Sequence, residues 1–288
     1  MQSLRDNIHL EDKYTGITLA AINLPQGMIY IDAPPTPEEA RVWRADLLDL
    51  ECGYERLLIN LDTNADRVIG SRAMDCPILV QENTAEYYRN RTGIFKNQGE
   101  LTGKVWETIP SLGNIRWSPP EITFSDQMSL HWGDTPIQLE HHSGSDIGAI
   151  WVVFPEEKIV FVGDAVLKNQ PPFLEKANIP RWLDDINLLM SEKYQGYTII
   201  SGRGGVCATS TIEKQREVLQ SAYQGLEHLA KKGAGIESTE KMIPALLDPL
   251  RFLAAERELF TARLRYGLAA YYTKHYLNAQ QLEEDPEE

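Results

Sequence analysis

The stretch AIWVVFPEEKIVFVGDAV, residues 149–166, constrains the fold most. Two apolar runs, 149–154 and 159–162, flank the turn sequence FPEEK and predict a buried β-hairpin. Asp164 follows the second run, and a carboxylate at the end of an apolar strand is costly unless it is paired or coordinated. The chain must therefore bury this hairpin in a sheet and give Asp164 a partner.

Short apolar runs and helix signals recur along the rest of the chain in the order strands, helix, strands, helix, strand, helix. Thr36, Pro37 and Glu39 form a helix start with the spacing of a capping box. Strands are expected at 17–24, 28–31, 56–61, 76–81, 122–124, 128–131, 137–139 and 197–202. Helices are expected at 36–50, 82–91, 179–196 and 210–233, with a long loop that contains a little helix at 93–119. This mixture predicts an α/β (α+β) fold with two sheets and helices outside them.

The chain divides by pattern into residues 1–235 and a helical extension, residues 236–288, which ends in the acidic tail EEDPEE. Leu253, Phe260, Leu264, Leu268 and Tyr271 recur at helical spacing, so they predict core or a homodimer face.

The net charge of −14 disfavours binding to nucleic acid or to anionic membranes, because both need a basic face. Three widely spaced cysteines, Cys52, Cys76 and Cys207, are typical of reduced thiols. No apolar signal core and no run of about 18 apolar residues occurs, so we expect a cytoplasmic protein.

Polar side chains follow several of the predicted strands. LDTNADR, residues 61–67, follows one, His141 and His142 precede the 149–166 hairpin, and SGRGG, residues 201–205, follows the strand at 197–202. A polar turn after a strand is the ordinary interpretation of any one of these motifs alone. Their order along the chain makes them more informative together.

In that order the motifs resemble those of the metallo-β-lactamase superfamily over residues 8–232. LDTNADRVIG is similar to the family's T-H-x-H-x-D-H segment, HHSGSDIGAIWVVFPEEKIVFVGDAV to its G-H-T segment, hairpin and G-D motif, and SGRGGV to its G-H-G motif. The resemblance implies a four-layer αββα sandwich, here with a C-terminal helical extension.

The seven metal-ligand positions of the family fall on Asp62, Asn64, Asp66, Arg67, His142, Asp164 and Arg203. Four of these differ from the family pattern. Asp62, Asn64, His142 and Asp164 together are a set that can hold one divalent metal, Mn, Fe, Mg or Zn. At the second position Arg67 and Arg203 exclude a metal, because a guanidinium has no lone pair to donate, so a dinuclear zinc centre is not expected. We expect the two arginines to bridge Asp66 and Asp164 instead.

Three functions fit these residues. The first is a metal-free pseudoenzyme with a binding or regulatory role, in which salt bridges of Arg67 and Arg203 occupy the family's metal site. The second is a mononuclear-metal hydrolase of small esters, lactones, thioesters or phosphoesters. The third is a metal-free enzyme that holds an anionic substrate through Arg67 and Arg203. For an active protein the candidate catalytic residues are Asp66, His142 and Asp164. A small-molecule ligand fits all three functions.

Overall fold

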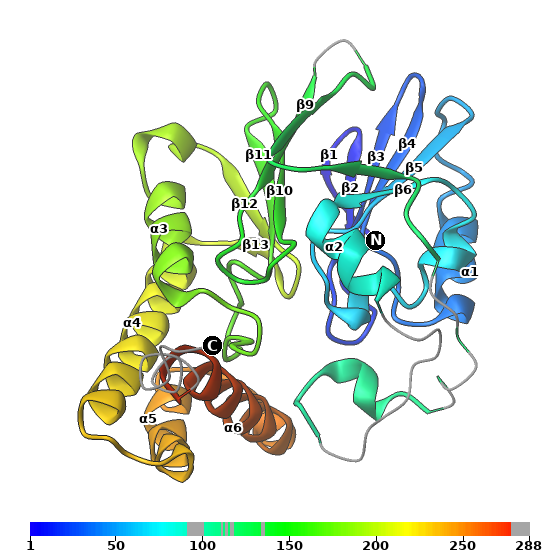
Figure 1. Ribbon diagram of the computed structural model, residues 1–288. Coiled ribbons are helices and arrows are strands. Elements are labelled where there is room, and N and C mark those ends of the chain that lie inside the picture. The colour runs from blue at the N-terminus through cyan, green and yellow to red at the C-terminus, as the bar shows by residue number, and fades with distance from the viewer. Residues whose placement is uncertain (91–100, 111, 113–114, 116–117, 134–135, 278–288) are drawn as a thin grey trace, which may run out of the picture.

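The computed structural model describes residues 1–90, 101–110, 112, 115, 118–133 and 136–277. Two β-sheets pack face to face, and helices cover the outer face of each (Figure 1). The predicted four-layer αββα sandwich is confirmed.

The first sheet has the strand order β1-β2-β3-β4-β5-β6-β7. Its strands are Gln2–Arg5, Ile8–Glu11, Leu19–Leu24, Gly27–Ile31, Glu55–Ile59, Ile78–Gln81 and Ile122–Phe124. The second sheet has the order β13-β12-β11-β10-β9-β8. Its strands, from β8 to β13, are Gln127–Leu130, Ile137–His141, Ile150–Phe154, Ile159–Gly163, Thr198–Ser201 and Gly205–Cys207. The predicted hairpin is β10–β11, paired antiparallel, and β12 adds to it in parallel.

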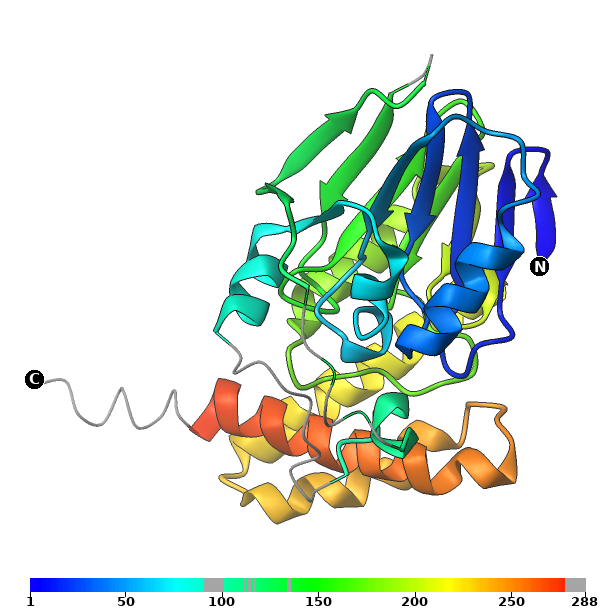
Figure 2. The same cartoon turned by 90° about the vertical axis from the view of Figure 1, so that its right-hand side faces the viewer.

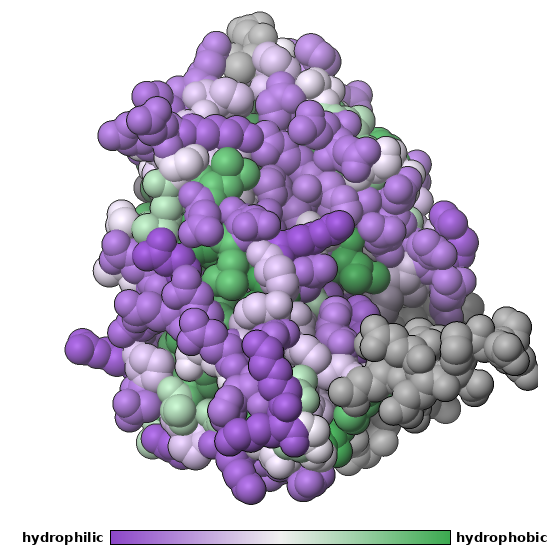
Figure 3. Space-filling view, turned by 60° about the vertical axis from the view of Figure 1, so that its left-hand side comes forward, coloured by the Kyte–Doolittle hydropathy of each residue, from purple (hydrophilic) through white to green (hydrophobic). Residues whose placement is uncertain are grey.

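Helix α1 (Pro37–Asp46) covers the outer face of the first sheet through Ala40 and Trp43, and α2 (Glu82–Arg89) lies at its edge. Thr36 is the N-cap of α1 as expected, since the Glu39 amide donates to Thr36 Oγ1 over 3.2 Å and Thr36 Oγ1 donates to Glu39 Oε2 over 2.8 Å. Helices α3 (Ile179–Leu189) and α4 (Thr209–Lys231) cover the second sheet. Their outward face carries mostly hydrophilic residues (Figure 3), as amphipathic outer helices require.

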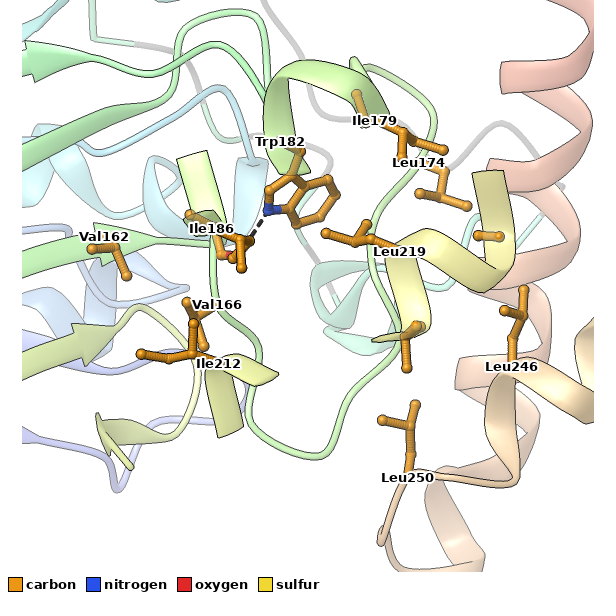
Figure 4. Close-up of a cluster of buried hydrophobic side chains, with 14 of the residues drawn as sticks. Val162, Val166, Leu174, Ile179, Trp182, Ile186, Ile212, Leu219, Leu246 and Leu250 are labelled. Atoms are coloured by element: carbon orange, nitrogen blue, oxygen red, sulfur yellow. Dashed lines mark hydrogen bonds between the residues drawn. The ribbon is translucent and has the colours of Figure 1, made fainter. Parts of the chain in front are cut away.

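Apolar side chains of both sheets form the central core, and a second core lies between the outer helices and the second sheet. Trp182 of α3 is fully buried in that second core, where its indole N–H donates to the Ala165 carbonyl over 2.8 Å (Figure 4). Leu246 and Leu250 join the same core from the C-terminal region. The extension therefore shares its core with the sandwich.

The C-terminal region contains α5 (Ile243–Leu247) and α6 (Arg257–Tyr272). Helix α6 runs across one end of the sandwich, beside the short helix η3 (Val105–Thr108), as both cartoon views show (Figure 2). Among the described residues, no helix combines the length and apolarity needed to cross a bilayer.

The sequence-based expectations differ from the structure in several places, of which two bear on the fold. The hairpin β1–β2 pairs residues that showed no clear strand pattern. The helix expected over 179–196 ends at Leu189 and is followed by a separate short helical turn, Glu192–Tyr194. The segment 93–119 was expected to be a long loop with a little helix, and η3 is such a helix; residues 93–100, 111, 113–114 and 116–117 lie outside the described residues.

Candidate functional site

Three buried aspartates lie just beyond the ends of three strands. Asp32 follows β4, Asp62 follows β5 and Asp164 follows β11, and each is at most 3% exposed. Asp32 adopts φ 61°, a left-handed conformation that non-glycine residues rarely adopt. Strain of this kind persists where surrounding contacts hold the residue, and Asp32 accepts a hydrogen bond from the Leu61 amide over 2.9 Å.

The guanidinium of Arg67 lies among these three carboxylates. Its Nη1 is 2.6 Å from Asp32 Oδ2, its Nε is 3.0 Å from Asp62 Oδ2, and its Nη2 pairs with Asp164 Oδ1. The Arg67 side chain has no exposed surface. Each of the three guanidinium nitrogens therefore faces a carboxylate, although Nε makes no hydrogen bond to Asp62.

Arg203 supplies a second buried cation. Its Nε donates to both Asp164 oxygens, at 3.0 and 3.1 Å, and its Nη1 lies 2.8 Å from Asp66 Oδ2. Nη1 also donates to the Gly16 carbonyl over 2.7 Å. We call this set the arginine–carboxylate cluster; its members are Asp32, Asp62, Asp66, Arg67, Asp164 and Arg203.

Two neighbours fit closely around the cluster. Asn64 donates through Nδ2 to Asp164 Oδ2 over 2.9 Å, so it acts as a hydrogen-bond donor. A Cβ at Gly202 would lie 2.0 Å from Arg67 Nη1, so a glycine at this position leaves the space that the guanidinium occupies. The site thus combines donors on Asn64 and two arginines with acceptors on four aspartates.

Burial and neighbouring charges move the pKa values of Asp62 and Asp164 in opposite directions. Burial raises the pKa of Asp62 to about 7, with the nearby Asp164 carboxylate adding to the rise despite the ion pair with Arg67. Burial also acts on Asp164, but the charges of Arg203 and Arg67 hold its pKa below the usual value. The cluster is therefore built around an ionised Asp164, while burial makes both Asp62 and Asp32 easier to protonate.

His142 does not join the cluster. Its Nδ1 lies 2.8 Å from Asp185 Oδ1 and its Nε2 lies 3.2 Å from Glu140 Oε2, while the ring stacks on Trp151 with centroids 3.6 Å apart. Both ring nitrogens already have carboxylate partners, so the four-residue metal set expected from the sequence is not assembled around His142. Asp62, Asn64 and Asp164 do lie together.

The segment after His142 explains this difference. Gly144 packs so closely on α3 that a Cβ there would meet Trp182 Cα at 2.4 Å. A G-H-T motif anchored on this glycine puts Ser145 at the histidine position and Asp146 at the threonine position. Asp146 accepts from the amide and the hydroxyl of Thr63, at 3.3 and 2.5 Å. Ser145 is buried, and its hydroxyl has no partner among the described residues.

Sequence reasoning missed Asp32, Asp146 and Arg263. Asp32 had a usable signal, because it follows an apolar strand just as Asp164 does. Asp146 was hidden by the neighbouring pair of histidines. Arg263 lies on α6, far from the other residues in sequence, and no local pattern connects it to the site.

Comparisons with known proteins identify the fold that carries this geometry. A metallo-β-lactamase from Pontibacter korlensis superimposes with a TM-score of 0.58 at 16% identity, covering 76% of this chain and 97% of its own. The DIM-1 metallo-β-lactamase gives a TM-score of 0.59 at 15% identity, covering 77% and 96%. A sec-alkylsulfatase, Pisa1 from Pseudomonas sp., gives 0.66 at 12% identity, covering 95% of this chain and 49% of its own.

At these identities the structural matches show a shared fold. The sequence profile of the metallo-beta-lactamase superfamily matches residues 73–206. The chain therefore has the metallo-β-lactamase fold. A search of curated proteins gave no significant match.

Metallo-β-lactamase superfamily members bind divalent metals, so the fit of a metal to this chain needs a test. Among the described residues, no group of three His, Cys, Asp or Glu side chains is arranged to hold an ion. The carboxylates that could be ligands are bound to Arg67 and Arg203, whose nitrogens carry hydrogens and positive charge instead of lone pairs. A metal does not fit this donor set as it stands.

Proposed function

We propose that this chain is a metal-free member of the superfamily, in which the arginine–carboxylate cluster takes the place of the metal centre and the protein has a binding or regulatory role. The observation that carries the proposal is Arg67, fully buried and bound to Asp32, Asp62 and Asp164. Its charge lies among the carboxylates, where a divalent ion would otherwise balance them.

Charge and reactivity both support this proposal. Hydrolysis in this superfamily uses a metal-bound hydroxide, which forms because the metal lowers the pKa of water to about 7. A guanidinium can neutralise carboxylates but cannot ionise a water in this way. His142, the candidate base, is bound to Asp185 and Glu140.

The metal-free enzyme with Arg67 and Arg203 holding a substrate is less well supported. That function needs both guanidinium groups open to a ligand, but each nitrogen of Arg67 already faces a carboxylate of Asp32, Asp62 or Asp164. The mononuclear hydrolase would require Arg67 to leave Asp62 and Asp164, which exposes two buried carboxylates to each other. Breaking a buried pair of this kind costs about 3–5 kcal/mol.

Metal content tests the proposal directly. We expect no bound metal, by elemental mass spectrometry, on protein purified without a metal-affinity tag and offered Mn, Fe and Zn. The positive control restores histidine with Asp62→His, Asn64→His, Arg67→His and Arg203→His, with and without Ser145→His. We expect metal uptake by the control, strongest with Ser145→His. One equivalent of metal on the wild type, lost in Asp164→Ala, would overturn the proposal in favour of a mononuclear hydrolase.

A further inference from the structure

Arg263, in the middle of α6, is a buried cation whose polar partners are neutral. Its side chain donates through Nε to the Gly103 carbonyl over 3.0 Å, and through Nη1 to Gln170 Oε1 and the Pro171 carbonyl, each at 3.2 Å. The residue is 1% exposed, and no ion pair joins it to a carboxylate of the described residues. Its Nη2 has no hydrogen-bond partner in the described part of the chain. A buried cation in such surroundings is costly.

The ring of Phe173 connects Arg263 to Arg203. The guanidinium carbon of Arg263 lies 3.8 Å from the ring centroid, and that of Arg203 lies 4.8 Å from it. Burial and the charge of Arg203 lower the pKa of Arg263 to about 9, so the two cations are close enough to repel each other. The charges of Asp164 and Asp66 oppose this effect, but the pKa of Arg263 stays lowered, so an additional anion beside Arg263 would stabilise its charged form.

Arg203 also has a free nitrogen. Its Nε and Nη1 are used by Asp164, Asp66 and Gly16, but its buried Nη2 has no hydrogen-bond partner among the described residues. Arg67 differs, because each of its three nitrogens, including Nε, lies within ion-pair distance of a carboxylate. The donors available for a ligand therefore belong to Arg203 and Arg263.

We propose that Arg203 and Arg263 form a binding site for one small anionic group with two or more acceptor oxygens, the chemistry that phosphate, sulfate and carboxylate share. The site lies beside the arginine–carboxylate cluster, where the sandwich meets α6. Each guanidinium would donate through its unpartnered Nη2, and the anion would supply the counter-charge that Arg263 lacks. This inference rests on the proposed function, since it requires Arg203 to remain the cation of the cluster.

Isothermal titration with inorganic phosphate, sulfate and acetate at constant ionic strength tests this site. For the wild-type chain we expect saturable binding of at least one of these anions with a stoichiometry near one. Arg263→Gln should weaken that binding by at least about tenfold, because it removes a charge-assisted hydrogen bond. Arg263→Lys keeps the charge and should bind with intermediate affinity. Arg257→Gln, on the same helix and directed at Phe252, is the matched control and should bind like the wild type.

Two results would overturn the site. One is the absence of saturable binding to the wild type with all three anions. The other is equal affinity in Arg263→Gln and Arg257→Gln, which would assign the binding to diffuse surface charge. If Arg263→Gln does not fold, equal affinity in Arg263→Lys and the wild type has the same meaning. Metal content is a separate readout, so a metal-free chain that binds no anion contradicts this site and leaves the proposed function standing.

Discussion

Asp62 and Asp164 contribute to stability in opposite pH ranges. Because the folded pKa of Asp62 is raised to about 7, its contribution is fully present below the unfolded pKa of about 4 and is lost as pH rises through 7. The folded pKa of Asp164 is lowered, so its contribution is present above the unfolded pKa and is lost as pH falls through the folded value. The same cluster therefore holds one carboxylate that resists protonation and one that accepts it.

Replacing these two carboxylates by amides should separate the two effects. We expect Asp62→Asn to remove the fall in stability between about pH 4 and 7, because an amide cannot ionise. Asp164→Asn should cost about 3–5 kcal/mol at pH 7, because it leaves Arg203 and Arg67 without their shared partner. Urea unfolding from pH 5 to 8 measures both variants. If the two variants lost the same free energy of unfolding at pH 7, the difference in charge state between Asp62 and Asp164 would be contradicted.

Gly202 gives a steric test of the same cluster. A methyl group at this position would overlap Arg67 Nη1, and Arg67 is held by three ion pairs, so it cannot move away cheaply. We expect Gly202→Ala to destabilise the fold by about 1–3 kcal/mol or more, as overpacking of a filled site does. Gly133→Ala is the control, because its added Cβ meets only the end of the Gln26 side chain at 3.7 Å. Identical unfolding midpoints for the two variants would show that Arg67 is mobile.

His142 should respond to pH independently of the cluster. Burial lowers its pKa, but the hydrogen bonds to Asp185 and Glu140 outweigh this and leave the pKa above 6.5. Its stabilising effect is therefore fully present below about pH 6.5 and is lost as pH rises through the raised value. Glu140 also accepts hydrogen bonds from the Lys193 ammonium and the Tyr194 hydroxyl, so these side chains belong to the same hydrogen-bonded network as His142.

We expect His142→Gln to destabilise the protein more at pH 6 than at pH 9, as measured by urea unfolding at both values. The exposed His131→Gln is the control and should behave like the wild type at both. A loss in His142→Gln that does not change with pH would mean that His142 packs on Trp151 as a neutral ring.

At the scale of elements, the hairpin β10–β11 and helix α1 were predictable because each is encoded by neighbouring residues. The β10–β11 turn and the Thr36 N-cap of α1 each involve residues only a few positions apart in sequence. The hairpin β1–β2 was not predictable, because its strands are short and it is stabilised by pairing with β3. His142 was misplaced for a related reason, since sequence alone does not say that Gly144 is the residue packed on α3.

Helix α6 gives a prediction at this scale. Leu264 is fully buried in the core that also contains residues of α3, α4 and the second sheet. We expect Leu264→Ala to cost about 2–5 kcal/mol and to lower the midpoint of one cooperative transition for the whole chain. Leu253→Ala, at an exposed position, should have little effect. Two separate transitions, of which Leu264→Ala shifts only one, would show that residues 236–288 unfold as a unit of their own.

For the whole molecule, the sequence predicted the sandwich and the edge at which polar residues collect, because the order of strands and motifs is visible along the chain. It predicted that Arg67 and Arg203 pair with aspartates. It could not predict that Arg67 binds Asp32 and Asp62 in addition to Asp164, because those pairs depend on how three strands end in space. Nor could it show that Arg263 lies beside Phe173, because this contact joins the C-terminal helix to a segment that is distant in sequence.

The pairing of Arg67 with Asp164 also has a consequence for how the chain folds. A metal ion diffuses in from solution and can enter a site after its ligands have gathered. Here the positive charges are part of the chain, and they must be carried to partners 97 residues away for Arg67 and 187 residues away for Arg203 and Gly16. Closing such long loops is slow, because the entropy is lost before the contacts are gained. The centre of this site should therefore form late in folding, and no cation added to the solution can take the place of that step.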